Sequence, residues 1–225
     1  MPDALTYLKA KFDLDLHQRP QPIEIPNTNR ETLARLFYLL GYAVGVELGV
    51  ERGVYTEVLL RENTIGTVHA VDAWKAYHGY RDHVNQAKLD RFYLETIERL
   101  KPFAQRVVLH RAFSAEAATR FADRSLDFVY LDAAHDLWSV INDLHVWAPK
   151  VKVGGIVAGH DYIKCPLPSL MHVPQAIHAW VDAYAIAPWF VLGRQAKIPG
   201  ELRDDGRSWF YVVPEPVPAR GKIKQ

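Results

Sequence analysis

Short apolar stretches alternate with amphipathic stretches along most of this chain. Five apolar stretches have the length of β-strands, at 44–48, 67–71, 106–110, 127–131 and 153–158. Apolar residues recur at helical spacing between them, at 55–61, 82–100, 115–122 and 137–144. The stretch at 127–131 is almost wholly apolar, as expected for a parallel strand that is covered on both faces. The pattern therefore predicts a series of strand–helix units.

Further elements are expected on either side of these units. Residues 28–31 have the spacing of a capping box, and apolar residues recur at helical spacing behind them up to residue 40. Beyond the fifth strand, a helix is expected over 173–185 and strands over 189–192 and 209–213. Only a polar, glycine-containing loop separates the last two strands, which predicts an antiparallel hairpin. Together the elements predict an α/β fold, a doubly wound seven-stranded mostly parallel sheet with one antiparallel strand near the edge.

The chain of 225 residues suits a single domain, which we expect to span 27–213. Residues 1–26 end in a segment with three spaced prolines, which predicts an N-terminal arm or lid outside the main sheet. Residues 214–225 are rich in Pro and Lys, and we expect them to form a flexible tail.

Composition narrows the class of partner. The 27 basic and 26 acidic side chains give a formal net charge of +1 without any block of like charge, so a nucleic-acid partner is not expected. The sequence also bears on the location of the protein, because no apolar stretch approaches the ~18 residues of a membrane-spanning helix. The N-terminal residues lack the apolar core of a signal peptide, and Cys165 is the only cysteine. We therefore expect a cytoplasmic protein that does not bind a membrane.

Acidic residues and glycines follow the first two predicted strands, at the edge of the sheet where ligands bind in such folds. Glu47, Gly49 and Gly53 end the first strand, and Asp72 ends the second. Glu47 stands where a dinucleotide-binding motif has its first glycine. A carboxylate there repels a pyrophosphate and attracts an ammonium or sulfonium group. Asp72 is placed to accept hydrogen bonds from ribose hydroxyls. The alternative is that the glycines only form turns and Asp72 only caps a helix.

Five stretches of the sequence carry a resemblance to a known family. Val46-Glu47-Leu48-Gly49 through Gly53, followed by Val71-Asp72-Ala73-Trp74, resembles the first two motifs of class I S-adenosylmethionine-dependent methyltransferases. The stretches 112–114, 127–135 and 154–162 are similar to the bacterial small-molecule O-methyltransferase branch. That branch includes the metal-dependent macrolide-sugar enzymes, and catechol O-methyltransferase is a more distant relative. The resemblance extends over residues 30–213.

The resemblance implies that S-adenosylmethionine is the cofactor. Glu47 and the backbone of Gly49 would hold its methionine end, and Asp72 would hold the ribose. The full set of cofactor-binding residues that it implies is Glu47, Gly49, Gly53, Asp72, Ala73, Trp74, Phe113, Ser114 and Asp132. Trp74, Phe113 and Ser114 would flank the adenine, although Trp74 is equally compatible with core packing.

Three candidate catalytic residues end the fourth and fifth strands. Asp132 and His135 follow the fourth strand, and Asp161 follows the fifth with His160 directly before it. A hydroxyl nucleophile needs a base, a metal ion or both. The resemblance implies that Asp132 binds a divalent cation, Mg or Mn, and that His135 is the general base. The remaining ligands in such enzymes are usually two adjacent acids.

In this chain a histidine replaces one of those acids. The expected metal ligands are Asp132, Asp161 and His160, whose nitrogen suits Mn better than Mg. His160 and Asp161 are adjacent on a strand, so they can share an ion only if the backbone turns at Gly159. The alternative is that Asp132 caps a helix and His135 is a solvated surface residue.

These residues predict methyl transfer from S-adenosylmethionine to a hydroxyl of a small molecule. The first alternative is a catalytically silent S-adenosylmethionine-binding protein, and the second is a nicotinamide-dependent dehydrogenase, which Glu47 disfavours. The sequence leaves open the identity of the methyl acceptor, the choice between O- and N-methylation, and whether the protein is a homodimer.

Overall fold

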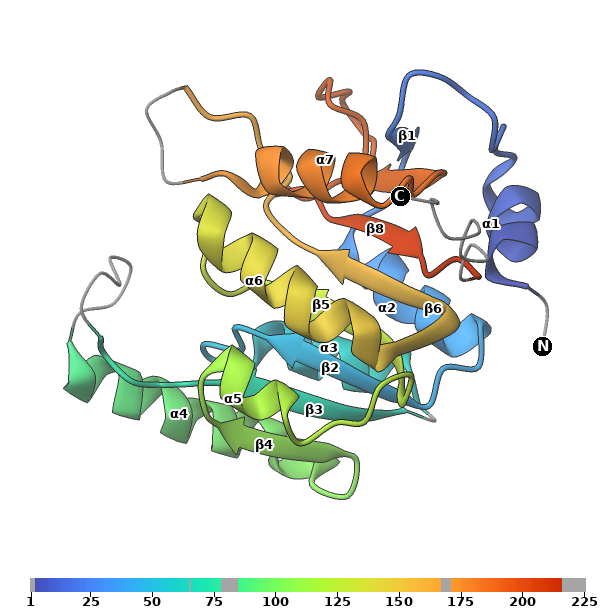
Figure 1. The fold of residues 1–225 in the computed structure, drawn as a ribbon. Helices are drawn as coiled ribbons and strands as arrows, with labels where there is room; N and C mark the ends of the chain where they lie inside the picture. Colours follow the sequence, from blue (N-terminus) through green and yellow to red (C-terminus); the bar gives the residue numbers. More distant parts are fainter. Residues whose placement is uncertain (1–2, 65, 78–84, 167–170, 216–225) are drawn as a thin grey trace, which may run out of the picture.

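A computed structural model describes residues 3–64, 66–77, 85–166 and 171–215. Its strands are β1 (Ile23–Ile25), β2 (Val44–Leu48), β3 (Thr67–Asp72), β4 (Val107–Arg111), β5 (Leu126–Leu131), β6 (Val151–Gly159), β7 (Trp189–Leu192) and β8 (Trp209–Val212). Its α-helices are α1 (Ala4–Phe12), α2 (Arg30–Leu39), α3 (Val54–Glu62), α4 (Gln86–Leu100), α5 (Ser114–Ala118), α6 (Leu137–Trp147) and α7 (Val173–Ala183). Figure 1 shows their arrangement.

The strands form a single sheet in the order β1-β7-β8-β6-β5-β2-β3-β4. All neighbours are parallel except β8, which is antiparallel to both β6 and β7. From β2 the chain adds β3 and β4 on one side, and β5 and β6 on the other. The point where the direction of winding changes therefore lies between β2 and β5, and ligands bind beside such a point in open α/β sheets.

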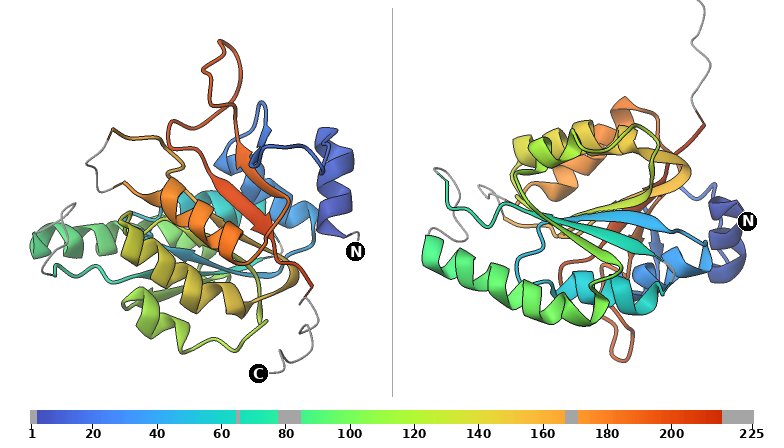
Figure 2. Two further views of the ribbon diagram at one scale, coloured as in Figure 1. Left: turned by 45° about the horizontal axis from the view of Figure 1, so that its top comes forward. Right: turned by 90° about the horizontal axis from the view of Figure 1, so that it is seen from below.

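Helices cover both faces of the sheet (Figure 2). α2, α3 and α4 lie on one face, and α5, α6 and α7 lie on the other. Each face has its own cluster of buried apolar side chains. Among the described residues, no helix is long and apolar enough to cross a membrane. The arrangement confirms the doubly wound, mostly parallel sheet and its terminal antiparallel hairpin.

The number of strands is eight rather than the seven expected. The additional strand is β1, which lies in the segment expected to form an arm outside the sheet. Ile23 and Ile25 are buried, and β1 pairs in parallel with β7 at the edge of the sheet. A strand of three residues among prolines is too short to produce a recognisable alternation, which is why the pattern missed it. α1 was also not expected.

Two local predictions were wrong in detail. The capping box is one residue further along the chain, because Asn29 caps α2 and exchanges hydrogen bonds with Thr32. The helical spacing of apolar residues in 82–100 predicts that Ile97 lies on the buried side of α4, but Ile97 is exposed and Thr96 is buried instead. Burial of Thr96 is tolerated because its hydroxyl donates to the carbonyl oxygens of Phe92 and Glu51. Residues 82–84, where this helix was expected to begin, lie outside the described residues.

Candidate active site

A cavity of about 650 Å³ lies at the ends of β2, β3, β4 and β5. Its wall is formed by the loops that follow these strands, by Asp161 after β6 and by residues of α4, α5 and α6. The sequence-predicted residues on this wall are Gly49, Asp72, Ala73, Trp74, Phe113, Ser114, Asp132, His135 and Asp161. The topology thus brings most of the predicted site residues to one place, although they are spread over more than half of the chain.

Gly49 permits the close approach of two strand ends. Its φ is +82°, a conformation that favours glycine. A Cβ at this position would lie 1.9 Å from the backbone oxygen of Asp132. Only glycine therefore allows the loop after β2 to rest against the loop after β5. Gly53 instead caps α3 and is not on the cavity wall.

Glu47 lies behind the cavity wall and not on it. Its side chain is 1% exposed and accepts a hydrogen bond from the hydroxyl of Thr56. Burial raises the pKa of Glu47 to about 8, although the Thr56 hydrogen bond opposes the shift. In the conformation described here, Glu47 is therefore a buried group in the protein interior.

Asp72 has a fixed orientation at the end of β3. One carboxylate oxygen accepts a hydrogen bond from the backbone N–H of Glu51 (2.9 Å), and the other accepts from the N–H of Trp74 (2.8 Å). The Trp74 side chain is fully buried and donates through Nε1 to the Glu51 carbonyl (2.7 Å). Trp74 thus contributes to the core, as the alternative interpretation held, and it also holds the loop next to Asp72.

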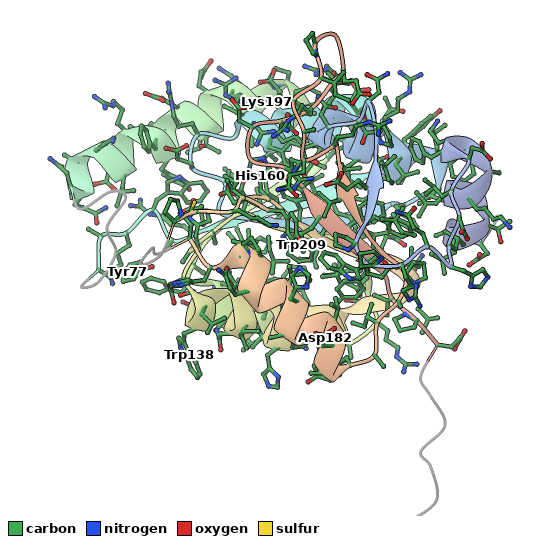
Figure 3. The ribbon with its side chains drawn as sticks, turned by 90° about the horizontal axis from the view of Figure 1, so that it is seen from above. Tyr77, Trp138, His160, Asp182, Lys197 and Trp209 are labelled. Carbon is green, nitrogen blue, oxygen red and sulfur yellow. The ribbon has the colours of Figure 1, made fainter. Side chains whose placement is uncertain are left out.

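Aromatic side chains surround the part of the cavity beyond Asp72. Phe113 is partly exposed and contacts Tyr77 edge to face, with 5.5 Å between ring centroids. Trp138, at the start of α6, is 78% exposed. Figure 3 shows Tyr77 and Trp138 on the same flank of the molecule, opposite α1. These rings offer flat apolar surfaces to a ligand at the mouth of the cavity.

Asp132, His135 and Asp161 form the polar end of the cavity. His135 Nε2 lies 2.8 Å from Asp161 Oδ2 and 3.9 Å from Asp132 Oδ1. Despite this proximity, Nε2 is buried and makes no hydrogen bond of acceptable angle. In the described part of the chain, these three side chains form the one group of this kind whose atoms lie close enough to hold a metal ion.

The charges in this group affect one another. Burial lowers the pKa of His135, but the Asp132 and Asp161 carboxylates outweigh it and raise that pKa to about 10. Burial raises the pKa of Asp161, but His135 and His160 bring it well below its usual range. Without a ligand, His135 is therefore protonated at neutral pH and Asp161 is ionised.

His160 lies beside the group but the backbone turns later than expected. The turn is at Asp161, whose φ is +56°, and not at Gly159. His160 Nδ1 is 3.3 Å from Asp161 Oδ1 and 3.9 Å from Asp132 Oδ1. Its Nε2 is buried and has no hydrogen-bond partner. Gly206 packs directly against this pair, because a Cβ there would lie 2.5 Å from Asp161 Oδ1.

Sequence reasoning missed three residues near the site. Arg30 Nη1 lies 3.9 Å from Asp132 Oδ2, with the guanidinium over the ring of Tyr55 at 5.1 Å. Asp143 and Trp138 line the cavity from α6. All three lie on helices, and none follows a strand directly. The one signal available for Asp143 was a carboxylate on the otherwise apolar side of a predicted helix.

Comparisons with known proteins identify the class. Residues 46–162 match a family model described as a methyltransferase domain. This match spans more than half of the chain and includes both strand-end motifs and the group Asp132, His135 and Asp161, so the protein belongs to this family of methyltransferase domains. The resemblance stated from the sequence is thereby confirmed. No curated protein matches the chain in sequence.

Solved structures support the fold. The O-methyltransferase from Bacillus cereus in complex with SAH is 16% identical, with a TM-score of 0.57, and the match covers 93% of this chain and 88% of that one. The O-methyltransferase TomG from Streptomyces achromogenes in complex with SAM is 16% identical, with a TM-score of 0.58 and coverages of 95% and 91%. Spermidine synthase from Thermotoga maritima is 12% identical, with a TM-score of 0.53 and coverages of 81% and 57%. The last example shows that this fold serves more than one reaction.

Proposed function

We propose that this protein transfers a methyl group from S-adenosylmethionine to a hydroxyl of a small molecule. The observation that carries the proposal is the single cavity that joins Gly49 and Asp72 to the group Asp132, His135 and Asp161. Such a cavity accommodates a nucleoside at one end and brings a reacting group to a base at the other. O-methyltransferases with this fold have been solved with SAM and SAH bound.

The charges on the wall suit a cationic methyl donor. Asp72 offers carboxylate oxygens to the two ribose hydroxyls, and its orientation is fixed before any ligand binds. Asp132 and Asp161 lie where the sulfonium end would be, and carboxylates stabilise a nearby positive charge. A pyrophosphate would be repelled by the same groups, which disfavours a nicotinamide cofactor.

His135 is the residue that we assign as general base. In the reaction, the acceptor oxygen attacks the methyl carbon, the C–S bond breaks to leave S-adenosylhomocysteine, and the hydroxyl proton passes to His135 Nε2. That nitrogen is buried and faces both carboxylates, 2.8 Å from Asp161 Oδ2. It must be unprotonated to act, whereas the two carboxylates favour its protonated form.

A divalent cation fits the same group of residues. Carboxylate oxygens of Asp132 and Asp161 lie close enough to hold one ion, and His160 Nδ1 lies 3.9 Å from Asp132 Oδ1 and 3.3 Å from Asp161 Oδ1. Together they offer the mixed nitrogen and oxygen ligands that Mn binds well. We assign Asp132 and Asp161 as ligands and His160 as a third. When bound, the cation would lower the pKa of the acceptor hydroxyl and offset the charge that keeps His135 protonated.

The test has two parts. First, S-adenosylhomocysteine and NAD are each titrated into the protein, and the melting temperature is followed; the former should raise it by mass action and the latter should not. Second, methyl-labelled S-adenosylmethionine is incubated with the protein and a panel of phenols, sugars and polyketide alcohols. Transfer of label to a hydroxyl supports the proposal. Binding without transfer to any acceptor, including a source extract, would favour the silent binding protein.

A further inference from the structure

Asp143 is part of the cavity wall, but the proposed chemistry does not use it. It lies in the middle of α6, and its side chain is 6% exposed. Buried carboxylates are uncommon unless they are paired or hydrogen-bonded. No basic side chain pairs with Asp143 in the described part of the chain, so another reason for its burial is needed.

A short chain of hydrogen bonds fixes the orientation of this carboxylate. Trp147 Nε1 donates to Ser114 Oγ (2.9 Å), and Ser114 Oγ hydrogen-bonds to Asp143 Oδ1 (2.5 Å). An indole N–H can only donate, so the serine oxygen accepts from it and directs its own proton at Asp143. Asp143 Oδ1 is therefore occupied as an acceptor.

The second carboxylate oxygen of Asp143 has no hydrogen bond within the described residues. Since this oxygen is unpaired but is not fully buried, it has some exposure to solvent. Asp143 lines this cavity as well as a small adjoining pocket beside His135 and His160, so a ligand in the cavity lies next to this carboxylate. An acceptor atom held in this way selects a ligand that places a donor opposite it.

The order of the strands indicates which part of the ligand lies there. Along the sheet, β2, β3 and β4 are consecutive, so Gly49, Asp72 and Ser114 follow one another along the cavity. A nucleoside whose ribose binds Asp72, and whose reacting end lies near Gly49, has its base beside Ser114 and therefore beside Asp143. Phe113 offers an aromatic surface at the same position.

We propose that Asp143 is a specificity-determining residue that recognises adenine by accepting a hydrogen bond from its exocyclic N6 amino group at Oδ2. This inference rests on the proposed function, because it takes S-adenosylmethionine as the cofactor. Burial raises the pKa of Asp143 to about 6, with Ser114 opposing the shift and Asp136 adding to it. Above pH 7 the group is thus mostly a carboxylate, which accepts hydrogen bonds but cannot donate one.

The inference is tested with two ligands that differ only at C6 of the base and in the proton that N1 carries as a result. S-inosylhomocysteine has a carbonyl oxygen in place of the N6 amino group. This oxygen and Asp143 Oδ2 are both acceptors, so they cannot hydrogen-bond to each other. We expect the native protein at pH 8 to bind S-adenosylhomocysteine roughly 10- to 100-fold more tightly, in line with one unpaired buried group. Calorimetric titration gives both dissociation constants.

The Asp143→Asn variant makes the expectation sharper. Since Ser114 donates its proton, the amide oxygen should face Ser114 and the amide NH₂ should face the cavity. This NH₂ suits the inosine oxygen and not the adenine amino group, so the preference should shrink or reverse. Asp182→Asn is the matched control, because Asp182 is an exposed carboxylate on α7 (Figure 3), and its ratio should equal that of the native protein.

The possible failures can be told apart. Equal binding of the two ligands by the native protein would overturn the role of Asp143, and this result does not depend on any variant being folded. An unchanged ratio in a folded Asp143→Asn protein would overturn it as well. If neither ligand binds the native protein, the proposed function itself fails together with the inference.

Discussion

The two ends of the cavity differ in how completely their polar atoms are satisfied. The end that holds Gly49 and Asp72, where the methyl donor is expected to bind, is called the donor end here. There both oxygens of Asp72 accept backbone hydrogen bonds, and Gly49 packs so closely against the loop after β5 that a Cβ would clash with it. At the catalytic end, His135 Nε2 is buried in an ion pair with Asp161 Oδ2 at 2.8 Å, and His160 Nε2 is buried without a hydrogen-bond partner. Such atoms are rare in folded proteins because leaving them unpaired costs free energy.

This difference indicates how each end works. The donor end is organised by its own backbone, so it needs no rearrangement to receive a nucleoside. The catalytic end holds two carboxylates and two imidazoles, and we expect an ion or a substrate to bind among them. Changes at the catalytic end should therefore affect turnover, whereas changes at the donor end should affect cofactor affinity.

Replacing His135 tests the catalytic end most directly. His135→Ala should lower kcat by roughly 10²- to 10⁴-fold, which is the usual loss when a general base is removed. The affinity for S-adenosylhomocysteine should change little, since the donor end is intact. His145→Ala, an exposed histidine on α6, is the matched control. Near-normal turnover in His135→Ala would show that His135 is not the general base.

Removing divalent ions is the second test of this end. After exhaustive EDTA treatment we expect turnover to fall by about 100-fold or more, because a bound metal contributes several kcal/mol to such reactions. Mn should restore activity better than Mg if the nitrogen of His160 is a ligand, and His160→Asp should reverse that order. Full activity in EDTA would exclude the ion from the mechanism and leave a histidine as the sole base.

Asp72 provides the corresponding test at the donor end. Asp72→Ala should weaken binding of S-adenosylhomocysteine by roughly 10- to 100-fold, because two charge-assisted hydrogen bonds to the ribose are lost. Turnover at saturating cofactor should fall much less. Asp123→Ala, a surface carboxylate paired with Lys150, should leave both quantities unchanged. A fall in kcat with unchanged affinity would contradict the separation of the two ends.

The sequence predicted most of the fold because the strand–helix units are long and periodic. β1 and α1 escaped prediction because one is very short and the other lies in a segment of mixed composition. Asp72, Asp132, His135 and Asp161 could be placed at one site because they follow parallel strands, whose ends lie along one edge of the sheet. The contacts of Asp143 depend on how α6 packs against α5, which no local pattern records.

Glu47 shows the opposite limitation. Its position at the end of β2 predicted contact with the cofactor, but the direction of its side chain depends on tertiary packing. Residues alternate between the two faces of a strand, and Glu47 points into the layer that contains Thr56 of α3. In this structure Glu47 is a buried carboxyl group, so its contact with the cofactor stays a prediction, and without a ligand its main measurable effect is expected on stability.

The smallest expected effect is a change in the pH dependence of stability. The folded state raises the pKa of Glu47 from 4.5 to about 8. Between these values the folded protein keeps a proton that the unfolded chain has released, so stability falls as pH rises. The slope due to this one group is about 1.4 kcal/mol per pH unit. Below pH 4.5 both states are protonated and the contribution of Glu47 is constant.

Glu47→Gln replaces the titrating carboxyl group by an amide of similar shape. It therefore removes the contribution of Glu47 to the pH dependence of the free energy of unfolding. Urea unfolding of the ligand-free protein at pH 5.5, 6.5 and 7.5 should show a free energy of unfolding that falls less steeply in the variant than in the native protein. The gap between the two should widen by up to about 1.4 kcal/mol for each pH unit. Glu31→Gln, which changes an exposed glutamate paired with Arg61 on the surface, serves as control and should follow the native slope. Parallel curves for Glu47→Gln and the native protein would mean that Glu47 is ionised in the folded state, and an ionised Glu47 would again be available to a cationic cofactor.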